Sequence, residues 1–316
     1  MTMWQVDGWQ PSYGASFAAP QGPSAPAETK VALDCEIAAG AWAGRDAAPD
    51  VRRPDVVLLV DGVRRIDATL WSQEPDGATF PALAVSYAAG VVRCDLGAGR
   101  AELVGATVRR GLFTASPTAQ PLVTGHVSYP VVHARGAVTI DKLPAAVQSP
   151  LTGLEIEVSD QQRVDGDLLV LDGPLRRRDH VRTVGFAKTH ERDYLPPEQR
   201  TVTTGLAAGQ RTPVFQLGPG QPYSWYLRLP GGGGGPWAGV IRVECPGERS
   251  TGAAIALADL SQVTLPGLAS VSYKDPRAPQ NLAPVAGLER RLRALLGDSR
   301  LLRRSILLAT RAGARS

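Results

Sequence analysis

Two aspartates follow short apolar runs in this sequence, and each stands directly before a glycine. The run VVLLV at 56–60 leads to Asp61, and the run LLVL at 168–171 leads to Asp172. Apolar runs of this length, bounded by a turn signal, are typical of strands buried on both faces. A carboxylate at the end of such a strand is costly unless it is hydrogen-bonded, paired or bound to a metal. Asp61 is therefore either the start of an Asp-Gly hairpin turn or a functional carboxylate.

The recurrence of this pattern favours a shared site. Two buried strands that each end in Asp-Gly can bring their carboxylates together at one edge of a sheet. Clustered carboxylate oxygens are the ligands that hard cations such as Mg²⁺ and Mn²⁺ prefer. The sequence therefore indicates a site for a divalent metal at Asp61 and Asp172.

A third carboxylate stands on a predicted helix before the second strand. Residues 151–161 place Leu151, Leu154 and Val158 at helical spacing, with Glu155 beside this apolar face. A helix followed directly by the strand of Asp172 gives an α/β crossover. Glu155 is either a further site residue or a solvated glutamate, and the rival candidates for its role are Glu102 and Glu157.

A lysine also falls close to these carboxylates in the predicted order of strands. Residues 181–190, VRTVGFAKTH, read as a strand that carries Lys188 near its end. Such a lysine could hold a phosphate or orient an attacking water, as phosphoryl transfer requires. A surface lysine is the alternative.

Composition excludes several other classes of protein. The chain has 316 residues, of which 43% are hydrophobic and 20% charged, with a net charge of +4. The cysteines Cys35, Cys94 and Cys245 are odd in number and lack metal-ligand spacing, which argues against a disulfide framework and a zinc finger. Neither a signal peptide nor a membrane-spanning run is expected, so we predict a cytoplasmic protein. The glycine run at 231–235 lacks the lysine of a phosphate-binding loop.

The remaining segments predict the domain organisation. We expect residues 1–27, rich in Pro, Gly, Ser and Ala, to form a flexible arm, and residues 28–316 to form one domain. Residues 28–42 are predicted to form an amphipathic helix. Alternation in 81–96 and 101–113 predicts antiparallel strands of a meander. Further strands are expected at 223–229 and 238–244, whose aromatics form core or stack on bases.

The C-terminal region combines apolar and basic residues at helical spacing. Within 273–298, a proline-containing loop leads into a predicted helix whose apolar face is Val285, Leu288, Leu292 and Leu295. Glu289 lies in its first turns, Arg290 lies on its polar side, and 301–309 continue as a second basic helix. The arginines form either a solvated face or a track for a phosphate backbone.

Taken in order, these motifs resemble the NurA nuclease family over roughly 56–296. The motifs are VDG at Asp61, LDGPL at Asp172, VGFAKTH, the aromatic and RVE strands, and a proline loop that enters a helix. The resemblance implies an α/β fold with an RNase H-like core, whose mixed sheet is flanked by helices and extended by antiparallel strands. It also implies manganese-dependent DNA cleavage, a homodimer, and action on DNA ends and double-strand breaks together with the hexameric translocase HerA.

Residue by residue, the resemblance assigns roles to several positions. Asp61 and Asp172 are similar to the two family aspartates, and Glu155 stands near the place of the family glutamate. The family element Tyr-Pro-x-Pro-Leu-x-x-Ala-His is similar to residues 281–289 here, where Asn281 replaces the tyrosine and Glu289 the histidine. Glutamate binds a hard cation as histidine can, but the change leaves the metal preference and the last ligand open.

We therefore predict a nuclease that uses Mn²⁺ or Mg²⁺, acts on DNA with a HerA-like partner and does not enter a membrane. The predicted catalytic set, of which all but the lysine bind metal, is Asp61, Glu155, Asp172, Lys188 and Glu289. The predicted DNA contacts are Arg64, Arg176, Arg177, Lys188, Asn281 and Arg290. The alternatives are a non-catalytic DNA-binding or translocase-docking subunit with this fold, and an enzyme that acts on RNA or hybrids.

Overall fold

The computed structural model describes residues 31–134, 136, 139–175, 180–188, 194–231 and 233–313. The predicted N-terminal arm lies outside these residues. The chain divides into two compact units. The first comprises Met1–Val60, Val92–Glu102 and Arg163–Gly287, and the second comprises Asp61–Val91, Leu103–Gln162 and Leu288–Ser316. The single domain expected from residue 28 onward stays a prediction.

The strands of the described residues confirm the predicted α/β class with a large mixed sheet. Their order in the main sheet is β6-β3-β2-β1-β7-β8-β11-β10-β9, and β4 pairs with β5 in a small second sheet. The bounds are β1 Val56–Gln73, β2 Thr79–Asp95, β3 Arg100–Thr114, β4 Leu122–Val123, β5 Ser128–Tyr129, β6 Val131–His133, β7 Leu168–Asp172, β8 Thr183–Ala187, β9 Phe215–Gln216, β10 Tyr223–Arg228 and β11 Val240–Cys245. β1, β2 and β3 are neighbours joined by tight turns, which gives the predicted antiparallel extension.

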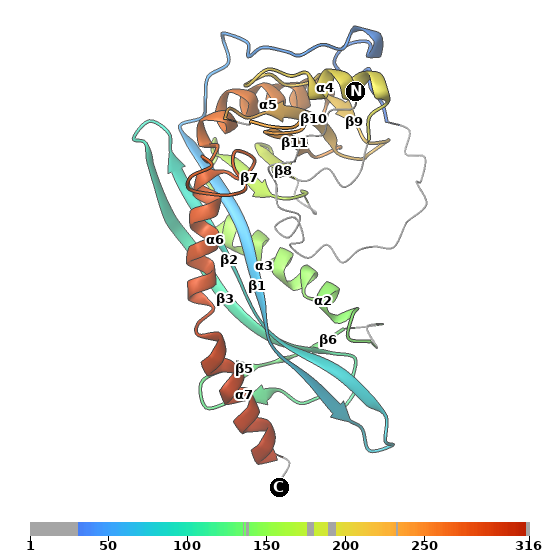
Figure 1. Cartoon of the computed structure of the whole chain (residues 1–316), viewed down its shortest axis with the longest axis vertical. Coiled ribbons are helices and arrows are strands. Elements are labelled where there is room, and N and C mark those ends of the chain that lie inside the picture. Colours follow the sequence, from blue (N-terminus) through green and yellow to red (C-terminus); the bar gives the residue numbers. More distant parts are fainter. Residues whose placement is uncertain are drawn as a thin grey trace. The chain divides into compact units, whose positions relative to one another are not determined.

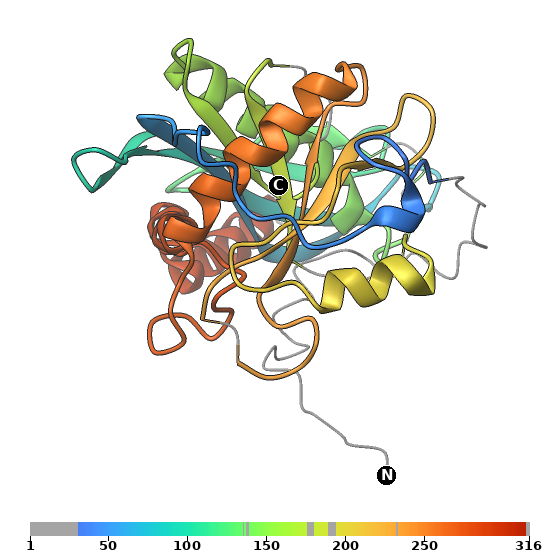
Figure 2. The same cartoon turned by 90° about the horizontal axis from the view of Figure 1, so that it is seen from above.

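In the first unit, parallel and antiparallel strands meet at β8. β7 runs parallel to the start of β1 and to β8, whereas β11 is antiparallel to β8 and to β10. Helix α5 (Thr251–Thr264) packs on β10 and β11 (Figures 1 and 2). It begins at Ser250, whose hydroxyl accepts a hydrogen bond from the Ala253 amide, as a good N-cap does. The first unit also contains α4 (Pro197–Thr204) and the 3₁₀ turns η1 (Ala39–Ala41) and η2 (Leu265–Leu268).

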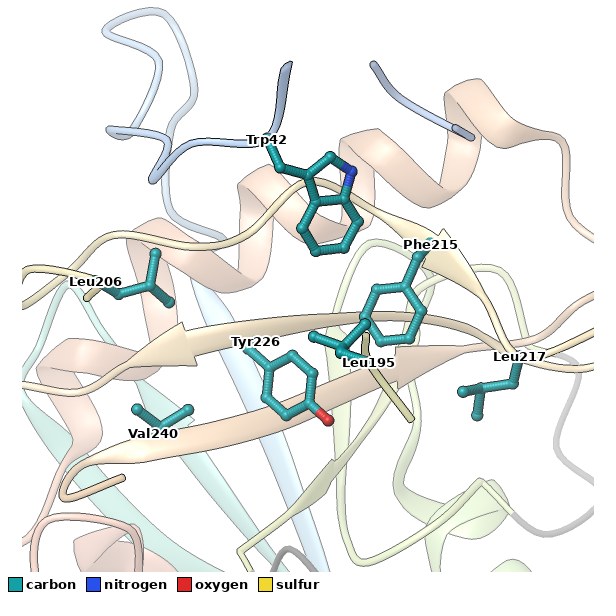
Figure 3. Close-up of a cluster of buried hydrophobic side chains, with 7 residues drawn as sticks. All are labelled: Trp42, Leu195, Leu206, Phe215, Leu217, Tyr226 and Val240. Carbon is teal, nitrogen blue, oxygen red and sulfur yellow. The ribbon is translucent and has the colours of Figure 1, made fainter. Parts of the chain in front are cut away.

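The aromatic residues of β10 belong to the core, which decides between the two interpretations given above. Trp225 and Tyr226 are buried, and Tyr226 stacks on Phe215 with ring centroids 5.9 Å apart. Figure 3 shows Tyr226 and Phe215 in one cluster with Trp42. These rings are not available for stacking on bases.

The helix predicted over 28–42 is wrong in its described part. From residue 31 the chain is irregular, apart from a bridge between Ala32 and Gln216 and the short turn η1. The apolar residues pack against the aromatic cluster individually, and the Trp42 indole donates to the Leu33 carbonyl at 2.9 Å. The apolar residues in this segment therefore serve tertiary packing, although their spacing is that of a helix.

In the second unit, β1 continues straight through Asp61 and Gly62, so the turn predicted there is wrong. A Cβ atom on Gly62 would lie 2.5 Å from the Glu155 Oε1 atom and 2.8 Å from the Leu151 Cδ1 atom. Glycine at this position gives room to the side chains of helix α3 (Gln148–Gln162), which approach the strand closely, and does not serve a chain reversal. α3 itself confirms the helix predicted around Glu155, and the short helix α2 (Leu143–Ala146) precedes it.

Helices α6 (Ala283–Leu295) and α7 (Ser299–Gly313) confirm the two predicted C-terminal helices (Figure 1). Val285, Leu288 and Leu292 are buried as predicted, but Leu295 is 39% exposed and Leu296 takes its place in the core. The carbonyls at the end of α6 are held by Arg65, which donates to Leu296 and Gly297. Within the described part of the chain, no helix has the length and apolar character needed to cross a membrane.

Candidate metal centre

Asp61 and Asp172 stand on paired strands. Val60 pairs with Leu171 in the parallel register of β1 and β7, and each aspartate is the next residue along its strand. The buried apolar residues before them fix both strands, because every residue from Val57 to Leu59 and from Leu168 to Val170 is fully buried. The two apolar runs therefore form buried strands, as predicted from the sequence. Asp61, however, lies within its strand and not at its end.

Three carboxylates form the candidate group for a cation. Asp61 and Asp172 follow the paired residues Val60 and Leu171 of neighbouring strands, and Glu289 is the third carboxylate of a group that could hold a metal ion. Glu289 comes from the first half of α6, and the buried Val285, Leu288 and Leu292 fix the rotation of that helix. Asp61 is buried, and Asp172 and Glu289 are partly buried. An all-carboxylate donor set fits a hard divalent cation such as Mg²⁺ or Mn²⁺.

Glu155 lies next to this group, but it is not a member of the trio found among the described residues. Its Oε1 atom lies over Gly62, the residue that follows Asp61. Its rivals lie on exposed surface, where Glu157 pairs with Arg109 at 2.7 Å and Glu102 pairs with Arg100 at 3.3 Å.

Lys188 is a largely buried partner of Asp172, so the alternative of a surface lysine is wrong. Its side chain is 11% exposed, and its ammonium donates to Asp172 Oδ2 at 2.5 Å and to Asn281 Oδ1 at 2.6 Å. The ammonium also lies 5.2 Å from the centre of the Phe186 ring. Lys188 therefore places one positive charge directly beside the Asp172 carboxylate.

Asp275 completes this arrangement, although no pattern in the sequence marked it. The Asn281 side-chain nitrogen donates to Asp275 Oδ2 at 2.6 Å, and the Arg277 amide donates to Asp275 Oδ1 at 2.8 Å. Burial raises the pKa of the Asp275 carboxyl, but the hydrogen bonds from Asn281 and Arg277 outweigh it and hold the pKa below the usual range. We call Asp172, Lys188, Asn281 and Asp275 the Asp172 cluster.

The turn after β7 is fixed by residues that were not among the predicted site residues. Gly173 has φ +114°, and its carbonyl oxygen would lie 2.6 Å from a Cβ atom at position 185, where the chain has glycine. The buried Glu244 accepts from the Leu175 amide at 2.9 Å and from Arg242 at 2.6 Å. These contacts hold the chain just beyond Asp172. The RVE motif in the sequence contains both Arg242 and Glu244 and could have pointed to this role.

The predicted DNA contacts have different surroundings. Arg290 is exposed on α6, whereas Arg64 donates to the Pro144 carbonyl at 2.7 Å and is partly buried. Asn281 is fully buried, so its side chain contacts the protein. Arg176 and Arg177 lie outside the described residues.

Comparisons with known proteins give similar structures but no sequence match. No protein-family model and no curated protein matches the sequence. Among solved structures, the NurA nuclease from Sulfolobus solfataricus is similar with a TM-score of 0.44 and 12% identity, over 87% of each chain. The endonuclease V from Bacillus subtilis is similar with a TM-score of 0.35 and 12% identity, over 76% of this chain and 80% of that one.

Proposed function

We propose that this protein is a metal-dependent nuclease that hydrolyses phosphodiester bonds in DNA. The observation that carries the proposal is the pairing of β1 with β7, which sets Asp61 and Asp172 side by side, with Glu289 as the third member of the candidate metal group and a largely buried lysine on Asp172. Such a site has the ligands for a hard cation and a fixed ammonium close to where that cation would lie.

The residues have two proposed roles. Asp61, Asp172 and Glu289 hold Mn²⁺ or Mg²⁺, with Glu155 as a further candidate beside Gly62. When bound, the metal would activate water and stabilise negative charge on a phosphate. Lys188 holds its ammonium next to Asp172, where it can attract the scissile phosphate.

The biological setting of this activity follows from the resemblance to the NurA family. We propose that the protein acts on DNA ends during double-strand break repair, as a homodimer and together with a HerA-like hexameric translocase. The basic side chains Arg64, Arg290 and the arginines at 176 and 177 are the proposed contacts to the DNA backbone.

Cleavage of end-labelled linear DNA tests the proposal. The purified protein is incubated with single- and double-stranded DNA in the presence of Mn²⁺, Mg²⁺ or EDTA, and RNA is added as competitor. We expect degradation with metal, none with EDTA, and strongly reduced degradation by the Asp172→Asn variant. Equal degradation by wild type and Asp172→Asn would contradict the assignment of the site. Preferential cleavage of RNA would identify RNA, and not DNA, as the substrate.

The exposed surface of α7 supports a second candidate function. Arg300, Arg303 and Arg304 are exposed on this helix, and Leu301 and Leu308 are 48% and 58% exposed beside them. Ser299–Gly313 contains no acidic residue. A basic and apolar surface of this kind suits a docking subunit for DNA or a translocase. Salt-sensitive DNA binding without cleavage under any metal, with or without a HerA-like partner, would favour this function.

A further inference from the structure

The orientation of the Asn281 amide is determined by the two charged groups on either side of it. An ionised carboxylate only accepts hydrogen bonds, and an ammonium only donates them. Asn281 contacts Asp275 at 2.6 Å on one side and Lys188 at 2.6 Å on the other. Both contacts can be hydrogen bonds only when the amide nitrogen faces Asp275 and the amide oxygen faces Lys188. Asp275 therefore selects the orientation that gives Lys188 its second acceptor.

The surroundings keep this chain of contacts rigid. Asn281 is fully buried and Asp275 is 4% exposed. The Asn281 backbone is held on both sides, since its amide donates to the Arg277 carbonyl and its carbonyl accepts from the Ser270 amide, each at 3.0 Å. Arg277 also pairs with Asp275 Oδ1 at 3.3 Å, which holds the carboxylate oxygen that does not contact Asn281. A buried amide held in this way has no water with which to exchange partners.

We propose that Asp275 is a positioning residue for Lys188, and that it acts through the amide orientation of Asn281. The ammonium of Lys188 is thereby held between Asp172 Oδ2 and Asn281 Oδ1 instead of folding onto the carboxylates alone. The consequence for DNA cleavage rests on the proposed function, but the positioning itself does not.

An exchange of the two side chains separates this role from simple packing. In Asp275→Asn, the new amide can place its nitrogen towards Asn281. The Asn281 amide then turns its oxygen to position 275 and its nitrogen to Lys188, where two donors face each other. In Asn281→Asp, two carboxylates face each other across the former hydrogen bond. The double variant Asp275→Asn/Asn281→Asp restores a donor at 275, an acceptor at 281 and an acceptor for Lys188.

Chemical labelling of Lys188 measures its position without any assay of cleavage. The protein is treated with formaldehyde and cyanoborohydride, and the methylation rate of each lysine is followed by mass spectrometry. Lys142 is exposed and distant in sequence from the cluster, so it serves as an internal control. In wild type we expect Lys188 to react slowly. In Asp275→Asn we expect the Lys188 rate to rise about tenfold, as for the loss of one hydrogen bond to a charged group, and to return to the wild-type rate in the double variant.

Unchanged Lys188 labelling in a folded Asp275→Asn variant would overturn the proposal, and so would a double variant that labels as fast as Asp275→Asn. If Asp275→Asn does not fold, Asn281→Ala removes the same acceptor and must also raise the Lys188 rate. The kcat for cleavage should follow the labelling pattern, with lower values in both single variants and recovery in the double variant. Absence of cleavage in wild type would contradict the proposed function while leaving the labelling result to decide on Asp275.

Discussion

Two aspartates, one on β1 and one on β7, show how differently this chain treats a carboxylate. Asp67 is buried and accepts hydrogen bonds from Arg65 at 2.8 Å, Ser86 at 2.5 Å and Tyr129 at 2.9 Å. Both of its oxygens are satisfied by protein donors, so Asp67 is a structural residue. We call this group the Asp67 cluster.

Asp172 has different surroundings. Lys188 donates to one of its oxygens, and the register of β1 and β7 places it beside Asp61. Asp172 and Asp61 also belong to the group of carboxylates that could hold a metal ion, whereas Asp67 does not. The comparison teaches that burial alone does not mark a site, and that membership of a carboxylate group suited to a hard cation does.

The largest expected effect comes from making the same change in both aspartates. Asp172→Asn should lower the cleavage rate by about 10²- to 10³-fold, because it removes a metal ligand. Its free energy of unfolding should fall by no more than about 1–2 kcal/mol, because the Lys188 ammonium keeps Asn281 Oδ1 and gains the new amide oxygen as acceptors. Cleavage assays and urea unfolding check both values. A wild-type cleavage rate in the folded variant would remove Asp172 from the site.

Asp67→Asn should show the reverse pattern. The amide keeps one accepting oxygen but places its NH2 either against Arg65 or against Ser86 and Tyr129, and it loses the charge that pairs with Arg65. The free energy of unfolding should therefore fall by about 2–3 kcal/mol. The cleavage rate per folded molecule should stay within about twofold of wild type, since the change leaves transition-state contacts intact. The comparison would break if Asp67→Asn remained as stable as wild type and lost cleavage.

Alanine substitutions at Gly62 and Gly153 test how closely α3 packs on β1. Gly62→Ala should destabilise the protein by about 1–3 kcal/mol, because its Cβ atom would meet Glu155 and Leu151 at 2.5 and 2.8 Å. Gly153→Ala is the matched control within α3, where a Cβ atom meets nothing within 4 Å. It should stabilise the helix by up to about 1 kcal/mol. Thermal unfolding of both variants checks this, and equal shifts would contradict the close packing of α3 on β1.

The smallest expected effect is the pH dependence of the Asp67 cluster. Burial, together with the charge of Asp67, raises the pKa of Tyr129 to about 12. Because the folded state holds this proton more tightly, its contribution to stability is fully present below about pH 10, the usual pKa of tyrosine, and is lost as the pH rises towards the folded-state pKa. Up to about pH 11 the loss is on the order of 1 kcal/mol.

Tyr129→Phe should remove this alkaline loss of stability, because phenylalanine has no proton to release. Urea unfolding of wild type and variant between about pH 9 and about pH 11 measures the difference, across the range where an ordinary tyrosine titrates. A variant whose stability falls with pH as steeply as that of wild type would contradict the assignment to Tyr129.

The sequence allowed the aspartates to be found because their signal is local. A fully apolar run identifies a buried strand, and a carboxylate after it is conspicuous at Asp61 and at Asp172. The helices that carry Glu155 and Glu289 were also predictable, because their apolar residues recur at helical spacing. Strand pairing then supplied the proximity of Asp61 and Asp172.

The remaining features depend on contacts that sequence spacing does not show. Asp61 and Gly62 have the sequence of a hairpin turn. The structure instead uses the small size of Gly62 to accommodate Glu155 and Leu151, which come from a helix far along the chain. Asp275 lies in a proline-containing loop without periodicity, so its link to Lys188 through Asn281 could not be inferred. The helix expected over 28–42 failed for the same reason, since its apolar residues serve a tertiary cluster.

Titration of the protein with Mn²⁺ by isothermal calorimetry tests the metal centre most directly. Wild type, Asp172→Asn and Asp67→Asn are compared at one pH, so that the same chemical change is made inside and outside the proposed centre. We expect wild type and Asp67→Asn to bind Mn²⁺ alike and Asp172→Asn to bind at least about tenfold more weakly. Equal Mn²⁺ affinity in all three proteins, or no binding by wild type, would contradict the assignment of Asp61, Asp172 and Glu289 as a metal centre.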